Sequence, residues 1–217
     1  MITTKELYDL DHTMAGAYLA KYEYPWQALA GIKELIQELG AKLGEDYTEI
    51  TPAVWVHKTA KIAPTAYLGA PCIIGAGTEV RHCAFIRGAA LVGENCVVGN
   101  SVELKNVILF DNVQVPHYNY VGDSILGYKS HMGAGSVTSN VKSDKSLVVI
   151  HGDQDIATGL KKVGAMLGDF VEVGCNSVLN PGTVIGRHSN VYPCSCVRGT
   201  VPANSIWKTG GKIVEKR

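Results

Sequence analysis

The 217-residue sequence has no excess of charge, because 20 basic residues balance 20 acidic ones. It therefore has no general basic surface for nucleic acid or an anionic membrane, and any recognition of phosphate must be local. No apolar run approaches the length of a membrane span, and the first residues lack the apolar stretch behind a basic start that marks a secretory leader. We therefore expect a cytoplasmic protein with one extended core and a small appendage.

The six cysteines also lack a pattern. They form no C-x-x-C pair and no spacing typical of a metal site, so the sequence predicts no metal. Cys194 and Cys196 are the closest pair, and the alternation of a strand would place them on the same face. We interpret the cysteines as free thiols in a reducing compartment.

The sequence does contain a six-residue repeat. A period of six fits neither a helix, which repeats every 3.6 residues, nor a simple alternating strand. The strands of a β-sandwich would not keep a constant period over 48 residues. A glycine often follows the aliphatic residue, and a small or apolar residue lies four positions after it, as at Ala84 and Cys96. The aliphatic positions are Val56, Ile62, Leu68, Ile74, Val80, Ile86, Val92, Val98 and Leu104, then Leu167, Val173, Leu179, Ile185, Val191 and Val197.

This repeat predicts an all-β solenoid, a parallel β-helix of about seven coils over residues 51–207. Three repeats make one triangular coil of 18 residues, with the aliphatic side chains pointing inward and coils stacked about 4.8 Å apart. The small position faces the narrow axis, and we expect the glycines to supply the positive φ angles that corners require. Residues 208–217 then form a C-terminal tail.

Two other segments depart from the repeat. Residues 1–50 predict a helical appendage, with one helix over 26–43 and a shorter one over about 7–21. We expect this appendage to pack on the first coil, as a cap for the end of the solenoid, or on a neighbouring subunit. The period is lost again at about 139–165, which predicts a loop insertion, and binding sites often lie on such insertions.

Three polar motifs lie before or at the start of this insertion. The sequence N-x-V-E-x-K ends at Lys105, and Arg87 precedes that lysine by 18 residues. Positions 18 apart stack in an unbroken solenoid, so the two cations should lie about 5 Å apart and favour an anion such as phosphate between them. The other motifs are H-x-x-Y-x-G-D from His117 to Asp123, and G-A-G-x-x-x-x-N from Gly133 to Asn140.

In this order, the motifs resemble the acetyltransferase half of bifunctional sugar-1-phosphate nucleotidyltransferase/acetyltransferases, which make UDP-N-acetylglucosamine and related nucleotide sugars. The resemblance covers roughly residues 55–205 and includes T-G-x-[RK]-K-x-G-A at Thr158–Ala165. It implies a left-handed β-helix that assembles as a homotrimer with active sites between subunits. It also implies acetyl-CoA as co-substrate and direct transfer to the amine of an amino sugar phosphate or a nucleotide-linked amino sugar.

The resemblance also implies roles for individual residues. His117 would be the general base that takes a proton from the substrate amine, and an imidazole suits this role near neutral pH. Arg87 and Lys105 would hold the phosphate. Tyr120 and Asn140 would orient the sugar.

For the co-substrate, the resemblance implies that the backbone of Ala134 meets the thioester of acetyl-CoA. Lys161 and Lys162 would contact the CoA phosphates. Two departures leave the sugar undefined: His131 stands where the glucosamine-specific enzymes have asparagine, and Val141 replaces a tyrosine. Acyl transfer is therefore better supported than any particular sugar.

Two other functions remain open. A γ-class carbonic anhydrase uses the same β-helix, with three histidines around zinc between subunits, and His131 and His117 could approach each other. That class needs an H-x-x-x-x-H pair, however, and the position five residues after His117 is Gly122. The other alternative is a non-catalytic protein that binds a sugar nucleotide or CoA, because about 50 helical residues stand where the family has its nucleotidyltransferase domain.

Overall fold

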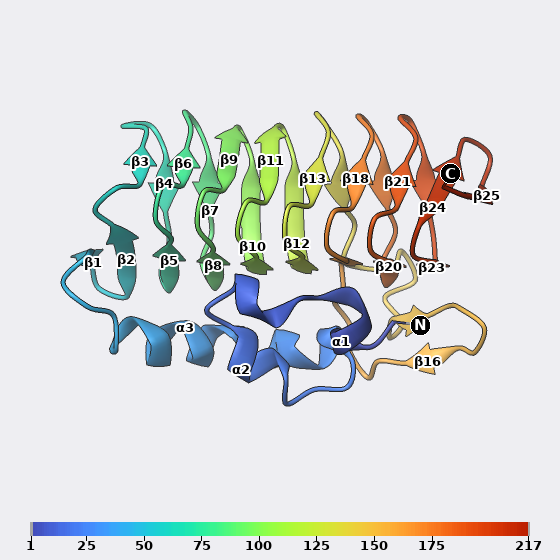
Figure 1. The fold of residues 1–217 in the computed structure, drawn as a ribbon, viewed down its shortest axis with the longest axis horizontal. Helices are drawn as coiled ribbons and strands as arrows, with labels where there is room; N and C mark the ends of the chain where they lie inside the picture. The colour runs from blue at the N-terminus through green and yellow to red at the C-terminus, as the bar shows by residue number, and fades with distance from the viewer. Residues whose placement is uncertain (1, 217) are drawn as a thin grey trace.

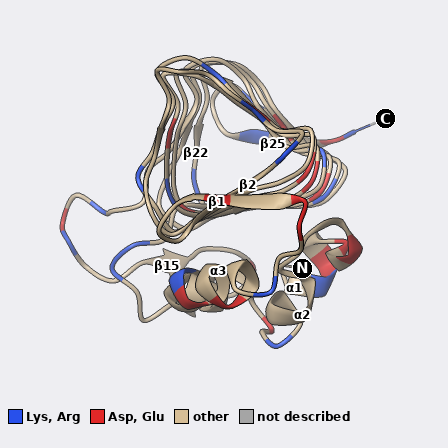
Figure 2. Cartoon of the chain, turned by 90° about the vertical axis from the view of Figure 1, so that its left-hand side faces the viewer, with Lys and Arg blue, Asp and Glu red and all other residues tan. Residues whose placement is uncertain are grey.

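The computed structural model describes residues 2–216 as a left-handed parallel β-helix with a row of short helices along one side (Figure 1). Viewed from the end, the solenoid is a triangle, and the helices lie beneath one of its faces (Figure 2). The predicted fold class is therefore confirmed. Within residues 2–216, no helix is long and apolar enough to cross a membrane.

Each face of the triangle is a ladder in which a strand pairs in parallel with the strands one coil before and after it. The first face contains β2 (Val54–His57), β5 (Cys72–Ile74), β8 (Ala90–Val92), β17 (Ala165–Leu167), β20 (Thr183–Ile185) and β23 (Thr200–Val201). The second face contains β3 (Lys61–Ile62), β6 (Glu79–Val80), β9 (Val97–Asn100), β11 (Gln114–His117), β13 (His131–Met132), β18 (Glu172–Val173), β21 (Asn190–Val191) and β24 (Ser205–Lys208).

The third face contains β4 (Tyr67–Leu68), β7 (Phe85–Ile86), β14 (Val137–Thr138), β19 (Val178–Leu179) and β22 (Cys196–Val197). Two longer strands, β10 (Glu103–Leu109) and β12 (Tyr120–Leu126), turn a corner and belong to both the third and the first face. The ends are closed by antiparallel strands, β1 (Tyr47–Thr51) on β2 and β25 (Lys212–Glu215) on β24.

The solenoid has about nine turns rather than the predicted seven. In the last coil, Val191 pairs with Trp207, so that coil is shorter than 18 residues. The six-residue pattern therefore does not extend into it. Coils in the middle are also short, since Ala90 pairs with Val107, 17 residues later. Residues of the predicted insertion leave the solenoid between Ile125 and Met166, which are partners in adjacent coils.

The aliphatic residues of the repeat point inward, as predicted, and most are fully buried. The prediction that the repeat glycines supply the positive φ angles of the corners was wrong. Corner residues with positive φ are mostly not glycine but residues such as Asn95 and Ser101. The repeat glycines instead permit close stacking, because a Cβ on Gly75 would lie 2.4 Å from the carbonyl oxygen of Gly93 in the next coil.

The helical appendage lies along the first face and does not cap the end of the solenoid (Figure 1). It consists of α1 (Thr4–Leu7), η1 (Leu10–His12), α2 (Gly16–Leu19), the 3₁₀ helix η2 (Pro25–Gly31) and α3 (Ile32–Gly40). The helix predicted over 26–43 is present as η2 and α3. The helix predicted over 7–21 is broken, because backbone groups of this segment bond the solenoid instead: Asp9 N–H donates to Asp169, and the His12 carbonyl accepts from Asp111 N–H.

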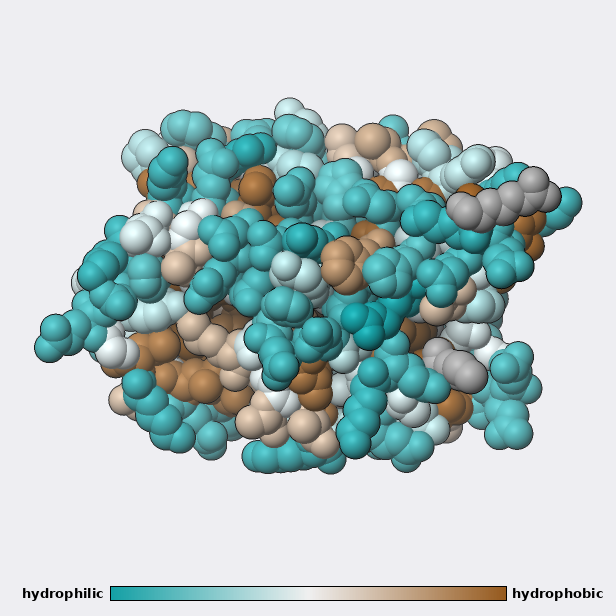
Figure 3. All heavy atoms as spheres, in the orientation of Figure 1, coloured by the Kyte–Doolittle hydropathy of each residue, from teal (hydrophilic) through white to brown (hydrophobic). Residues whose placement is uncertain are grey.

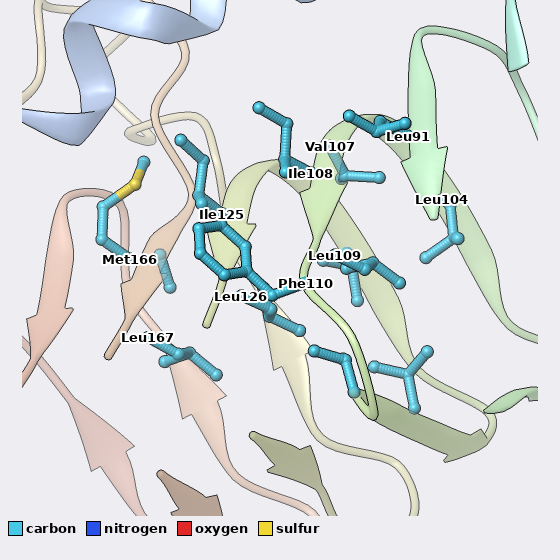
Figure 4. Packing of buried hydrophobic residues seen from close by; sticks show 14 of the residues in the cluster. Leu91, Leu104, Val107, Ile108, Leu109, Phe110, Ile125, Leu126, Met166 and Leu167 are labelled. Carbon is cyan, nitrogen blue, oxygen red and sulfur yellow. The ribbon is translucent and has the colours of Figure 1, made fainter. Parts of the chain in front are cut away.

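The reason for this location is a column of apolar side chains that point outward from the first face. Leu91, Ile108, Ile125 and Met166 are partners in successive coils and are at most 1% exposed. In Figure 4 they extend from the sheet away from the inward residues, such as Leu109. Ile108 lies four residues after Leu104, where the repeat predicts an inward small or apolar residue, but the 17-residue coil turns it outward. Apolar residues also gather where the helices meet the solenoid in Figure 3.

The insertion adds a small antiparallel hairpin, β15 (Val149–Ile150) and β16 (Ile156–Ala157). Val148, Ile150 and Val163 are fully buried, so the insertion packs on the solenoid through an apolar side. A Cβ on Gly182 would lie within 3.1 Å of Val148 and Ile150 side chains, which shows how closely this segment approaches β20.

Candidate active site

The polar motifs meet at two corners of the same region of the solenoid. One corner joins the second and third faces and carries His117. The other joins the third and first faces, and we call its polar side chains the corner cluster: Arg87, Glu103, Lys105, Asn106, Tyr120, Asp123 and Asn140.

The two predicted phosphate-binding cations do stack. Ile86 pairs with Leu104, so Arg87 and Lys105 follow each other in adjacent coils. Each is paired with a carboxylate of the chain: Arg87 Nη1 lies 2.8 Å from Glu103, and Lys105 Nζ lies 2.8 Å and 3.1 Å from the two oxygens of Asp123. The repulsion expected between two stacked cations is therefore relieved by protein carboxylates in this structure.

Asp123 is the centre of the corner cluster. Its side chain is almost fully buried and accepts hydrogen bonds from Lys105, Asn106 and Asn140. Its backbone adopts a left-handed conformation with φ of 48°, which asparagine and aspartate tolerate better than most residues. Asn106 also donates to the carbonyl oxygen of Leu29 at 3.2 Å, and this bond ties the cluster to η2 of the appendage.

Tyr120 and Asn140 are brought together as predicted. The Asn140 amide donates to the Tyr120 hydroxyl oxygen at 3.1 Å. Burial, and then the charges of Asp123 and Glu103, raise the pKa of the Tyr120 hydroxyl, so the phenol stays protonated and can donate to a ligand. The pKa of the Arg87 guanidinium is raised as well, chiefly by its hydrogen bond to Glu103.

His117 lies at the other corner, beside Ala134. The backbone N–H of Gly135 donates to the His117 carbonyl at 3.0 Å, so Ala134 is on the next coil above the histidine. Asn119 connects the two segments: its buried amide donates to the Gly133 carbonyl at 2.9 Å, and its oxygen accepts from the His117 N–H at 3.1 Å. The imidazole is exposed, and no hydrogen bond or ion pair within residues 2–216 occupies it.

Within residues 2–216, no hydrogen bond or ion pair joins the His117 side chain to the corner cluster. Glu103 and Tyr120 of the cluster lie on the third face, and its other members lie at the far edge of that face from His117. A ligand that contacts both must lie across this face.

A groove runs along the second face from Gly133 to the last hairpin. It has a volume of about 1090 Å³, and its lining includes Gly133, Gly174, Tyr192 and Lys208, which follow one another in successive coils. Lys216 lines the same groove. The small residues lie nearest His117, and the cations lie at the far end.

Two residues with sequence-based expectations lie apart from this arrangement, and a third lies within it. Lys161 and Lys162 are exposed at the end of the insertion and do not line the groove. His131 lines the groove, and its Nδ1 is 2.8 Å from a carboxylate oxygen of Glu172. Within residues 2–216, no three His, Cys, Asp or Glu side chains are grouped as a metal site.

Sequence reasoning missed several residues of the site. Asp123 was part of a motif but had no role, and Asn106 and Asn119 were not considered. The signal of Asn106 was weak, because its φ is 55° and an asparagine is common at left-handed corners of any solenoid. Asn119 followed no pattern that marked it as a buried link between coils. Lys208 lies beyond the regular repeat and had no signal at all.

Comparison with known proteins identifies the family. Residues 71–201 match the family model described as the GMPPB C-terminal domain. The chain belongs to this family. The "Bifunctional protein GlmU" of Methanococcus maripaludis is 33% identical over 199 residues, which cover 89% of this chain and 48% of that protein. A "Bifunctional sugar-1-phosphate nucleotidylyltransferase/acetyltransferase" of Sulfurisphaera tokodaii is 30% identical over 85% of this chain and 47% of its own length.

These relatives confirm the resemblance stated from the motifs, and the chain spans about half the length of the curated relatives it matches. Among solved structures, a hexapeptide transferase family protein from Anaplasma phagocytophilum has a TM-score of 0.43 and 16% identity. That alignment covers 75% of this chain and 78% of the other.

Proposed function

We propose that this chain is an N-acetyltransferase that transfers the acetyl group of acetyl-CoA to an amino sugar carrying a phosphate. The observation that carries the proposal is the arrangement of the two corners. A free imidazole and the backbone of Ala134 lie on one side of the third face, and paired cations with two sugar-orienting side chains lie on the other. The names of the GlmU-type relatives support the same chemistry.

The phosphate would lie at Arg87 and Lys105. Guanidinium and ammonium groups form charge-assisted hydrogen bonds with phosphate, and both cations now share their charge with carboxylates of the chain. Tyr120 and Asn140 would then contact the sugar hydroxyls, and the sugar would lie across the third face with its amine toward His117.

In the reaction, His117 would remove a proton from the substrate ammonium group. The free amine attacks the thioester carbonyl carbon, and the Ala134 N–H donates a hydrogen bond to the oxygen that becomes negative. The carbon–sulfur bond then breaks, CoA leaves as a thiolate, and His117 gives its proton to that thiolate. The second proton of the attacking nitrogen passes to water, which leaves a neutral amide. No bond to the protein forms at any step.

The groove on the second face would hold CoA. A flexible pantetheine arm needs a narrow, shallow channel, and Gly133 and Gly174 provide one. From Gly133 to Lys208 the groove crosses three coil steps, about 14 Å. That path would bring the thioester beside Ala134 and the phosphates of CoA near Lys208 and Lys216, whereas the role predicted for Lys161 and Lys162 would require a different path.

To test the proposed activity, we would measure release of the CoA thiol from acetyl-CoA with a panel of amino sugar 1-phosphates and UDP- or dTDP-amino sugars. His117→Ala should lower kcat by roughly 10²–10⁴-fold, the range for loss of a general base. His57→Ala, at a histidine of β2 in the first coil that lines neither the groove nor the corner cluster, is the matched control and should keep wild-type activity.

A wild-type rate in the His117→Ala protein would contradict the assigned base. Binding of CoA and a sugar nucleotide without thiol release in the wild type would instead support the non-catalytic alternative.

A further inference from the structure

An exposed aromatic pair continues the third face beyond the corner cluster. Tyr67 on β4 and Phe85 on β7 are partners in adjacent coils, and their ring centroids are 5.5 Å apart. They are 60% and 44% exposed, which is unusual for two large rings in contact on a mostly polar surface.

The pair is in register with the site. Phe85 is the partner of Glu103, and Glu103 is the partner of Tyr120, so one outward column contains Tyr67, Phe85, Glu103 and Tyr120 in that order. At about 4.8 Å per coil, Phe85 lies about 10 Å from Tyr120 and Tyr67 about 14 Å. Arg87 directly follows the strand of Phe85, and its guanidinium reaches Glu103 in the next coil toward Tyr120.

A ligand with its sugar at Tyr120 and its phosphate at Arg87 would direct its next group over these rings. A sugar 1-phosphate has no next group, because it ends at the phosphate. A nucleotide-linked sugar continues through a second phosphate and a ribose to a planar base.

We propose that Tyr67 and Phe85 form a stacking platform for the base of a nucleoside-diphosphate-linked amino sugar, and that this linked sugar is the acceptor. The inference rests on the proposed function of the site. A base stacks on an aromatic side chain through its π face, and Arg87 supplies a positive charge for the diphosphate. A second copy of the chain is the competing occupant of this surface.

The first test is binding measured by calorimetry. UDP, dTDP, GDP and glucosamine 1-phosphate are titrated into the wild type, the double variant Tyr67→Ala/Phe85→Ala, and the control Val178→Ala. Val178 is an exposed residue of the same column, two coils from Tyr120 on the opposite side.

We expect a nucleoside diphosphate to bind the wild type, and its Kd to rise roughly 5- to 150-fold in the double variant. Glucosamine 1-phosphate should bind all three proteins equally, and Val178→Ala should behave as the wild type. Unchanged nucleotide affinity in the double variant, or no nucleotide binding by the wild type, would overturn the platform.

Steady-state kinetics and the oligomeric mass of the protein distinguish a failure of this inference from a failure of the proposed function. For a nucleotide-linked acceptor, the double variant should show a raised KM and a nearly unchanged kcat. If the wild type acetylates glucosamine 1-phosphate as efficiently as the linked sugar, the platform is wrong and the acetyltransferase stands. If it acetylates neither, the acetyltransferase is wrong, and the nucleotide titration still decides the platform. A change of oligomeric mass in the double variant would show that the rings are a subunit contact and overturn the inference.

Discussion

Asp123 shows how single residues determine the shape of the corner cluster. A nearly buried carboxylate is costly unless it is paired and hydrogen-bonded, and here one ammonium and two amide groups satisfy it. In return, the carboxylate fixes the orientations of Lys105 and Asn140. The groups that we propose to bind phosphate and orient the sugar are therefore held in place before any ligand arrives, which would reduce the entropy lost on binding.

Asn119 has the same role at the other corner. It is 2% exposed, and its amide bonds hold the His117 turn against the Gly133–Ser136 turn of the next coil. The imidazole thus remains exposed while its backbone is fixed beside Ala134.

The cysteines allow a prediction at this scale. Cys72 and Cys96 occupy the inward small position, and burial raises the pKa of each thiol to about 12. The other four cysteines are exposed. With a disulfide reagent at pH 8, we expect four thiols per chain to react in the native protein and six after denaturation, because the buried pair has almost no thiolate and no access.

The variants Cys72→Ala and Cys96→Ala serve as controls and should leave the native count at four. A native count of six would contradict the inward placement of these residues.

At the scale of elements, the first face and the helices enclose a second hydrophobic core. The solenoid has an inner core along its axis and an outer one between the first face and the helices, where Trp26, Ile32 and Ile36 are at most 2% exposed. The appendage therefore behaves as a layer packed on a sheet, and its location follows from the outward apolar column.

This second core predicts the effect of one substitution. Ile108→Ala should lower the free energy of unfolding by about 2–5 kcal/mol, because it removes buried methylene groups between β10 and the helices. Val178→Ala, at an outward position of the third face that no helix covers, should change it by no more than about 0.5 kcal/mol. Urea unfolding followed by circular dichroism measures the free energy of unfolding of both variants. Equal losses in the two variants would show that the helices do not bury the outward side chains of the first face.

The covered face could have been predicted from the sequence, although the six-residue repeat hid it. Ile73, Leu91, Ile108, Ile125 and Met166 recur once per coil, at spacings of 18, 17, 17 and 41 residues. A search for a constant period misses such a column, because the shortened coils and the insertion change its spacing. The broken helices before Tyr24 had no such signal, since their bonds go to distant residues such as Asp169.

At the scale of the whole molecule, the helices of residues 2–216 cover one face of the solenoid and leave the other two uncovered. Both carry parts of the proposed site: the second face has the groove, and the third lies between the two corners. We expect a homotrimer in which these surfaces of neighbouring subunits approach each other, so that each site receives residues from more than one chain.

Light scattering coupled to gel filtration tests this assembly. We expect three times the mass of the chain at micromolar concentration, together with full activity in the trimer fraction. A monomer that retains full activity would contradict the expectation that the sites lie between subunits.

The sequence by itself determined the solenoid, its inward residues and the motifs that carry His117, Arg87, Lys105, Tyr120 and Asn140. These features are local, because each repeat must bury one aliphatic side chain, and the same spacing recurs whatever lies elsewhere in the chain. Only the tertiary structure decided which corner each motif occupies, what covers the first face, and where the groove ends. Those outcomes depend on coil lengths and on contacts between distant segments, such as Asn106 with Leu29, which no local pattern encodes.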